Sequence, residues 1–541
     1  MRSIESRLFA AISLLSAATL LTSPLPAATH PRYGGTLRVE LHVPSVSLDP
    51  REWQVGSLQS AVNEKLAELV FERLVALDNY GRFQPALATD WSHDGSNKRW
   101  RFVIRVGVKF SDGSPLNAED VVAALQPLLP ATEQISASGG VVVIQSSTPV
   151  PDLLEQLASG RYFIYRLASG GALAGTGPFV LGEAPVAGGK SEGKNSVASP
   201  RAETSGSTGP QSSGSHLFFR SNDEAWSGRP FLNGIDVTLG VPLVRAMFDL
   251  QLGKADLIDL SPELVPRARQ ANLRVWSSEP VTLYGLRFDG AQAAASDVRL
   301  REVLSLSLDR GTMANVLLQK QAEPAAALLP QWLSGYAFLF GVDTNLERAK
   351  ELRRGLPANE AAGSQPLRLR VDPAGDLAKL LAERVALNAR QAAILVQVIS
   401  RPVMRPGGAS PAPSDPPSGV HLFAWHYSSL SPRSELNSLF AAYNLTEPSE
   451  VNVTGTDHEQ LYARERRVLE DRRVLPLIVQ AESVGLGANV RDWMPARWGE
   501  WHLADVWLEL PEPVAADSSN TGNSAIQALP QPRPVAPGAK P

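Results

Sequence analysis

The chain has 541 residues, which at roughly 100–200 residues per domain indicates two to four domains. Its composition of 43% apolar and 20% charged residues is typical of a soluble globular protein, and 51 basic against 55 acidic residues leave no basic excess for a nucleic-acid backbone. The absence of cysteine excludes disulfides, thiolate zinc sites, cysteine nucleophiles and a lipid-modified N-terminal cysteine.

The first 28 residues are typical of a secretory signal peptide. Arg2 and Arg7 precede an apolar run over 8–21, and the small residues Ala27 and Ala28 follow where cleavage is expected. The run is shorter than the roughly 20 residues that cross a bilayer as a helix, although an uncleaved anchor is the alternative. We therefore expect export, and an exported chain without cysteine fits a bacterial periplasm.

Strand and helix patterns alternate in the first part of the chain. Apolar residues at every second position predict strands at 36–41 and 100–106, with Val106 on the apolar face of the second. Apolar residues at helical spacing predict a helix over 58–77. Asn117 stands where a helix N-cap belongs.

The same alternation continues in the second part. Asp297 is expected to cap a helix, a further helix is expected from 457 to about 468, and a strand is expected at 475–479. Mixed alternation of this kind indicates an α/β fold.

Three segments have the composition of unfolded chain. Residues 182–215 hold seven Gly, eight Ser and three Pro between two strand-like runs, 402–419 hold six Pro, and 511–541 hold seven Pro without periodicity. We expect a disordered insertion at the tip of a hairpin, a Pro-rich excursion and a disordered tail.

Searches for catalytic and metal-binding motifs find none. The sequence lacks His-Glu-x-x-His, a phosphate-binding Gly-rich loop and a dinucleotide-binding turn. His421 and His426 are close, but five residues apart in a strand they face opposite ways, so we expect no metal site there. We predict no catalytic residue, no metal and no cofactor.

An ordered series of motifs resembles family 5 extracellular solute-binding proteins, the oligopeptide, dipeptide and nickel class of ABC importers. The motifs run in order from about residue 33 to 510 and are Gly34–Val39, Leu48–Pro50, Leu69–Val75, Pro85–Trp91, Trp100–Val122, Gly175–Phe179, Gly253–Asp256, Asp297–Arg310, Leu461–Tyr462 and Leu475–Leu477. The most specific stretch is WRFVIRVGVKFSDGSPLNAEDVV.

The resemblance implies a type II-like periplasmic-binding-protein fold, with two lobes, a hinge and an extra subdomain in the first lobe. The hinge lobe is expected to take 33–70, 172–285 and 480–510, the extra subdomain 71–171, and the second lobe 286–479. Such proteins close on a ligand between the lobes, because the ligand contacts both lobes only in the closed state.

The resemblance also points to candidate ligand-binding residues. Peptide-binding members carry a segment like W-x-x-D-Y-x-D-P, whose first Asp pairs with the amino terminus of a peptide, and here Trp425 and Pro432 remain while Ser428 and Ser431 replace both acids. Trp425 and Ser428 are therefore cleft candidates, and Tyr284 is a weaker one that is equally read as core. Trp425, alternating with Phe423 and Tyr427, is either a core residue or part of a cleft wall. As a wall residue, its replacement by Ala is expected to weaken binding with little loss of folding.

We predict a non-enzymatic, monomeric periplasmic protein that captures a small, peptide-like solute and delivers it to an ABC permease in the inner membrane. One alternative is a sensor or scaffold on the same fold that transports nothing. The other is a secreted hydrolase.

Overall fold

The computed structural model describes residues 30–168, 172–182, 216–289, 292–336, 340–342, 344–356, 366–400, 418–445 and 457–509. The predicted signal peptide, the tail and nearly all of the two Gly/Ser/Pro-rich segments lie outside these residues. Within the described part of the chain, no helix combines the length and the apolar character that crossing a membrane requires.

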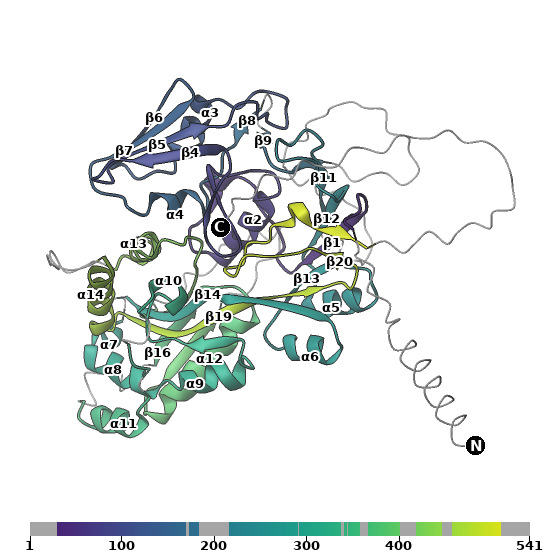
Figure 1. The fold of residues 1–541 in the computed structure, drawn as a ribbon. Coiled ribbons are helices and arrows are strands. Elements are labelled where there is room, and N and C mark those ends of the chain that lie inside the picture. The colour runs from purple at the N-terminus through teal and green to yellow at the C-terminus, as the bar shows by residue number, and fades with distance from the viewer. Residues whose placement is uncertain are drawn as a thin grey trace, which may run out of the picture.

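A mixed sheet of eleven strands runs through the whole molecule (Figure 1). Its order is β10 (Phe179–Gly182), β11 (His216–Ser221), β12 (Gly234–Leu239), β1 (Thr36–Leu41), β13 (Leu257–Leu260), β19 (Val474–Leu486), β14 (Arg274–Phe288), β18 (Val420–His426), β16 (Leu367–Val371) and β17 (Val396–Ser400), and β15 (Ala322–Pro324) pairs with β19. The strands from β10 to β13 belong to what is hereafter the first lobe, and β18, β16 and β17 belong to the second lobe.

Two long antiparallel strands join the lobes. β14 and β19 pair from Arg274 opposite Leu486 to Arg287 opposite Val474, with shifts in register around Pro280. The first lobe adds β13 at one end of β19, and the second lobe adds β18 at the other end of β14. The middle of this two-stranded ribbon is therefore the crossing between the lobes.

A smaller sheet forms the β4–β7 subdomain above the first lobe (Figure 1). Its order is β4 (Ala88–His93), β5 (Arg99–Ile104), β7 (Val141–Ser146) and β6 (Glu133–Ser138), accompanied by α3 (Ala118–Leu125) and α4 (Leu153–Leu157). Three short pairs complete the strands, namely β2 (Val75–Leu77) with β3 (Phe83–Pro85), β8 (Arg166–Leu167) with β9 (Leu173–Ala174), and β20 (Val490–Arg491) with β21 (Trp507–Leu508).

Helices cover both lobes. The first lobe carries α2 (Leu58–Ala67), α5 (Leu243–Gln251) and α6 (Val265–Gln270), with 3-10 turns at Pro50–Glu52 and Leu503–Asp505. The second lobe carries α7 (Ala293–Ser296), α8 (Val298–Ser307), α9 (Arg310–Thr312), a π turn at Met313–Leu317, α10 (Gln331–Ser334), α11 (Leu346–Arg354), α12 (Asp376–Gln391), α13 (Pro432–Tyr443) and α14 (Asp457–Glu470).

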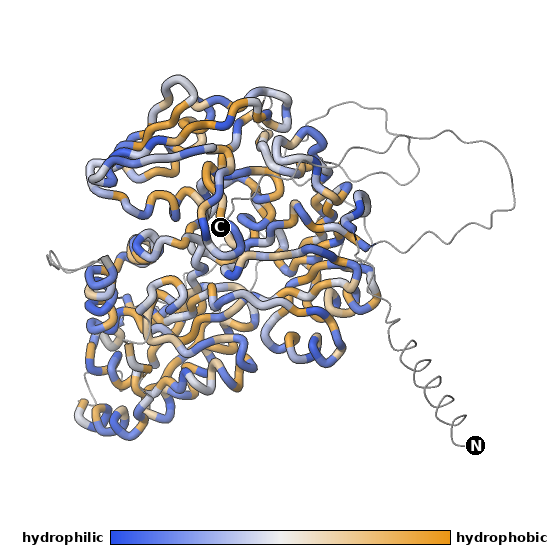
Figure 2. The backbone as a smooth tube through the Cα atoms, viewed as in Figure 1, coloured by the Kyte–Doolittle hydropathy of each residue, from blue (hydrophilic) through white to orange (hydrophobic). Residues whose placement is uncertain are grey.

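Apolar side chains gather in separate cores. One core joins the first-lobe sheet to the β4–β7 subdomain, a smaller one lies under α5 and α6, and two others cover the faces of the second-lobe sheet. In Figure 2 the apolar colour follows the inner strands, and the outer turns are mostly hydrophilic. Burial of apolar surface thus stabilises each lobe by itself, and the ribbon of two strands links them.

Most of the predicted elements are confirmed, and two are wrong in part. β1, the helices capped by Asn117 and Asp297, and the hairpin of β10 and β11 lie where expected. The helix predicted over 58–77 ends at Ala67, because the following residues turn away and Glu72 pairs with Ile164 instead. Val106 is 96% exposed, because β5 ends two residues before it.

Candidate functional site

A small polar pocket lies between the first lobe with its subdomain and the second lobe. Its volume is about 70 Å³. Three segments line it, namely Trp53 to Glu64 of the first lobe, Ser159 to Tyr162 beside the subdomain, and His426 to Ser438 of the second lobe. Seven of the lining residues are serines: Ser57, Ser60, Ser159, Ser428, Ser429, Ser434 and Ser438. Hydroxyl groups that both donate and accept hydrogen bonds therefore dominate the pocket.

Direct hydrogen bonds connect the lobes around this pocket. The backbone N–H of His426 donates to the carbonyl of Gly56 at 2.8 Å, and the Ser159 hydroxyl donates to Ser429 Oγ at 3.3 Å. The Ser431 hydroxyl, at the N-cap of α13, donates to the carboxylate of Asp152, next to α4. The structure is thus a closed arrangement in which the pocket holds only a few water-sized groups.

Gly56 of the first lobe and Trp425 of the second lobe lie in close contact. Gly56 has φ +76°, and a Cβ built there would lie 2.3 Å from Cε3 of Trp425. Both the left-handed backbone and the lack of space therefore require glycine. Any side chain at this position has to push the Trp425 ring, and with it the second lobe, away from the first.

The carboxylate of Glu435 organises the second-lobe side of the pocket. Its Oε2 accepts from Trp425 Nε1 at 2.8 Å, and its Oε1 accepts from the backbone N–H groups of Ser428 and Ser429 at 2.8 and 2.6 Å. Burial raises the pKa of Glu435 to about 7, against the lowering effect of these three donors. The residue fixes the loop that carries the serines.

Sequence reasoning missed Glu435. The available signal was local: Ser431 and Pro432 begin a helix, and an acid in the first turn of a helix is favoured by the helix dipole. That signal gives the acid a place on α13 but not its contact with Trp425, which depends on how α13 packs against β18.

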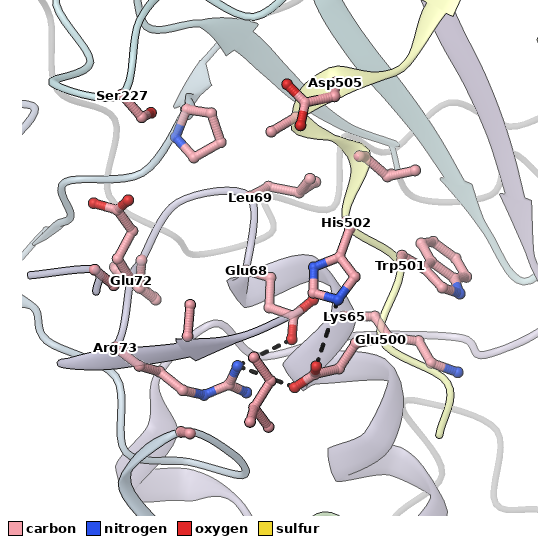
Figure 3. Close-up of a pocket in the computed structure, with 18 of the residues that line it drawn as sticks. Lys65, Glu68, Leu69, Glu72, Arg73, Ser227, Glu500, Trp501, His502 and Asp505 are labelled. Carbon is pink, nitrogen blue, oxygen red and sulfur yellow. Dashed lines mark hydrogen bonds and ion pairs between the residues drawn. The ribbon is translucent and has the colours of Figure 1, made fainter. Parts of the chain in front are cut away.

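A buried ion-pair network continues from the pocket into the first lobe. The Arg73 guanidinium lies 3.2 Å from each of Glu68 and Glu500 (Figure 3). It also lies 2.6 Å from Glu64 and donates to the carbonyl of Gly160. Burial raises the pKa of Glu64 to about 7 although Arg73 opposes the shift. Carboxylate oxygens of Glu64, Glu68 and Glu500 lie within 4.8 Å of one another, as a metal site requires, but Arg73 already supplies their cation.

A second pair of charges lies at the crossing between the lobes. Lys65 of α2 pairs with Glu482 of β19, and His426 Nδ1 lies 3.7 Å from the same carboxylate. Burial lowers the pKa of His426 to about 4 even though Glu482 works in the opposite direction, so His426 is neutral at physiological pH. His421 has different partners, Asp289 and Asp372 at 2.9 and 3.1 Å, and the two histidines do not share a site.

The family model of the bacterial extracellular solute-binding proteins, family 5 (Middle), matches residues 82–444. The chain belongs to this family. The match covers the subdomain, the crossing strand β14 and the second lobe as far as α13, and therefore includes two of the three segments that line the inter-lobe pocket.

Curated relatives support the assignment of this family 5 protein. It is 25% identical over 364 residues to the nickel-binding periplasmic protein of Escherichia coli, covering 62% of this chain and 67% of the relative. It is 36% identical over 115 residues to the probable deoxycholate-binding periplasmic protein YgiS of Escherichia coli, covering 21% of each chain. The alignment with that relative thus spans about a fifth of its length.

Solved structures show the same fold. The Helicobacter pylori binding protein DppA in complex with peptide STSA has a TM-score of 0.67 at 15% identity, covering 89% of this chain and 99% of that chain. The Escherichia coli murein tripeptide binding protein MppA has a TM-score of 0.68 at 16% identity, covering 88% and 99%. The predicted fold class, α/β of type II periplasmic-binding-protein kind with two lobes, and the predicted family are confirmed.

The three candidate residues of the family 5 protein lie in different surroundings. Ser428 lines the inter-lobe pocket. Trp425 lies directly behind the lining, 1% exposed, in a second-lobe core. Tyr284 is 4% exposed in the core on β14 and lines neither of the two cavities described for this chain. The expectation that Trp425 can be removed with little loss of folding stays a prediction, and the packing of its ring in the core and its bond to Glu435 argue against it.

Proposed function

We propose that this family 5 protein captures a small solute between its two lobes in the periplasm and delivers it to an ABC permease of the inner membrane. The observation that carries the proposal is the pocket lined from both lobes at the crossing of β14 and β19. A solute there contacts both lobes at once, so it stabilises the closed state over an open one. Among the described residues that line this pocket, no serine hydroxyl is hydrogen-bonded to His426 or to Glu435, which supports binding rather than catalysis.

Opening at the crossing follows from the proposal. The closed pocket of about 70 Å³ is smaller than a dipeptide, so a peptide-like solute enters when the lobes separate. We place the hinge in β14 and β19, where the hinge lobe passes into the second lobe at 285/286 and back at 479/480. The subdomain 71–171 moves with the hinge lobe. The register shifts around Pro280 support this, because irregular pairing bends more easily than a regular ladder.

The serine-rich lining supports recognition by hydrogen bonds to hydroxyl and main-chain groups. Ser428 and Ser431 stand where acids were expected, and both oxygens of Glu435 already accept hydrogen bonds within the second lobe. The relatives are named for nickel, deoxycholate, D,D-dipeptides and murein peptides, so their solutes differ in charge and shape. For this chain we propose a peptide-like solute whose amino terminus is not held by an ion pair.

We also propose that the protein is exported to the periplasm and acts there as a monomer. The relatives are periplasmic proteins, and the N-terminal pattern of basic, apolar and small residues supports a cleaved signal peptide.

A second candidate function is a binding or sensor protein that transports nothing. The direct hydrogen bonds between the lobes favour it, since they stabilise the closed state without help from a solute.

Native mass spectrometry of the mature protein, purified gently from its own periplasm, tests the proposal. We expect a retained small molecule of defined mass. Gly56→Ala should lose it, because the new methyl group forces the lobes apart at Trp425. Gly113→Ala is the matched control, since Gly113 also has a positive φ, +85°, but open space around its Cβ. Equal retention by both variants, or no retained molecule in the wild type, contradicts capture between the lobes.

A further inference from the structure

A second and larger cavity lies inside the first lobe, beyond the end of α2 (Figure 3). Its volume is about 560 Å³, which is within the ordinary range for a small-molecule site. Four parts of the chain line it: residues 65–86, Ala158 with Phe163, Pro178 with Trp226 and Ser227, and residues 492–505. It shares no lining residue with the inter-lobe pocket.

The walls of this first-lobe cavity are largely aromatic and aliphatic. The large apolar side chains that line it are those of Leu69, Phe71, Phe163, Trp226 and Trp501. All of them are buried except Trp226, which is half-buried. Such walls accept the apolar body of a ligand, and aromatic faces also attract an organic cation.

The charged groups of the lining are mainly acidic. Five carboxyl groups line the cavity, those of Glu68, Glu72, Asp492, Glu500 and Asp505, against two cationic side chains, Lys65 and Arg73. Both cations are shared with acids outside the lining, because Lys65 pairs with Glu482 and Arg73 pairs with Glu64. Acidic side chains in the lining thus outnumber its lysine and arginine side chains, although Arg105, which lies 4.1 Å from the Trp226 ring, also acts on Glu72 from outside the lining.

Two acids have capacity for a further donor. Glu72 Oε2 accepts from Thr176 Oγ1 at 2.6 Å and from Trp226 Nε1 at 2.7 Å, and both donors are neutral. Glu68 gives one oxygen to Arg73, while its buried Oε2 has no hydrogen-bond partner among the described residues. Unsatisfied buried polar atoms are rare and costly, and a ligand that bonds them removes the cost.

The acidity of these groups supports the same conclusion. Burial raises the pKa of Glu72 to about 7, and burial together with Glu500 raises the pKa of Glu68. A cation bound beside either carboxyl group favours its ionised form.

We propose that the first-lobe cavity is a second binding site, for a small organic cation that carries one ammonium or guanidinium group on an apolar body. The cationic group lies beside the carboxyl group of Glu72, and the apolar body lies against Phe71, Trp226 and Trp501. This site is separate from the inter-lobe pocket and does not depend on the solute captured there.

Calorimetric titration of the full mature chain with phenethylammonium tests the proposal. We expect saturable binding of one molecule per chain. The neutral isostere 2-phenylethanol should bind at least about tenfold more weakly, because a buried carboxylate discriminates strongly for a charged donor. Glu72→Gln keeps an acceptor for Thr176 and Trp226 but removes the charge, and it should weaken the amine by about tenfold or more. The control Glu347→Gln removes an exposed acid on α11 and should leave the affinity unchanged.

A second variant keeps the test decisive if Glu72→Gln fails to fold. Ser227 is exposed at the mouth of the cavity, so Ser227→Trp should block entry and abolish binding of phenethylammonium while the melting temperature stays unchanged. Absence of saturable binding, equal affinity for the neutral alcohol, or unchanged affinity in both Glu72→Gln and Ser227→Trp overturns the proposal. Amine binding that is lost in Gly56→Ala but not in Glu72→Gln also overturns it, because that result assigns the amine to the inter-lobe pocket.

Discussion

Single residues set how closely the two lobes approach. The Trp425 ring fills the space over Gly56, and its indole N–H bonds Glu435, which in turn holds the backbone of Ser428 and Ser429. Core packing, the pocket wall and the contact between the lobes thus depend on one side chain.

Replacing Trp425 by Ala should destabilise the protein by about 3–5 kcal/mol, because the change leaves a cavity in the second-lobe core and an unsatisfied Glu435 oxygen. Urea denaturation measures the loss. Ser428→Ala is the matched control at the pocket lining and should cost less than about 1 kcal/mol, since the backbone N–H that bonds Glu435 remains. A loss below about 1 kcal/mol for Trp425→Ala contradicts a core role.

For single residues, the sequence predicts which kind of residue lines the site better than it predicts which groups that residue contacts. The two serines in place of acids are readable as a pattern, and Ser428 does line the pocket, whereas the pattern left Trp425 as either core or cleft wall. The role of Glu435 is not readable, because it depends on contact between a strand and a helix. The Arg73 network is hidden for the same reason, since its acids come from 64, 68 and 500.

At the scale of secondary-structure elements, the sequence predicts single helices and strands better than their lengths and pairing. Local patterns predicted β1, the capped helices and the β10–β11 hairpin, because periodicity and capping are short-range signals. They predicted too long a helix from residue 58, because apolar spacing alone does not detect that the chain leaves the helix to pack against Ile164. The pairing of β14 with β19, some 200 residues apart, has no local signal and was not predicted from the sequence.

The β10–β11 hairpin offers a test at the scale of elements. Pairing from Phe179 with Ser221 to Gly182 with Phe218 is complete without residues 183–215. Replacing those residues by Asn-Gly should therefore change the melting temperature by less than about 2 °C, because short loops close such hairpins readily. Calorimetry measures the change, and a large drop would show that residues 183–215 contribute packing.

The whole molecule combines several buried acids with two separately packed lobes. Burial raises the pKa to about 7 at Glu64, Glu72, Glu133, Glu435 and Glu465. Unfolded glutamates titrate near about 4.3, so between these values the folded state binds protons that the unfolded state has released. Stability from these groups is therefore present at low pH and is lost as pH rises through about 7. The lowered pKa of His426 makes stability rise with pH instead, but it is one group against five.

The free energy of unfolding should accordingly be larger at about pH 5.5 than at about pH 8, as measured by urea denaturation at both values. Glu435→Gln should reduce the difference, because it removes one of the titrating groups, whereas the exposed control Glu347→Gln should not. Equal or greater stability at the higher pH contradicts the assigned burial of these acids.

Closure of the lobes on a solute is measured most directly by single-molecule energy transfer between dyes on the two sides of the crossing. The chain has no cysteine, so Thr132→Cys in the subdomain and His458→Cys on α14, both exposed, provide unique labelling sites. Protein that keeps its native solute should show one short distance. Protein stripped by unfolding and refolding should gain a population with a longer distance, which disappears when the extracted small molecules are returned. A single unchanged distance in all three samples would contradict capture by closure and favour the protein that transports nothing.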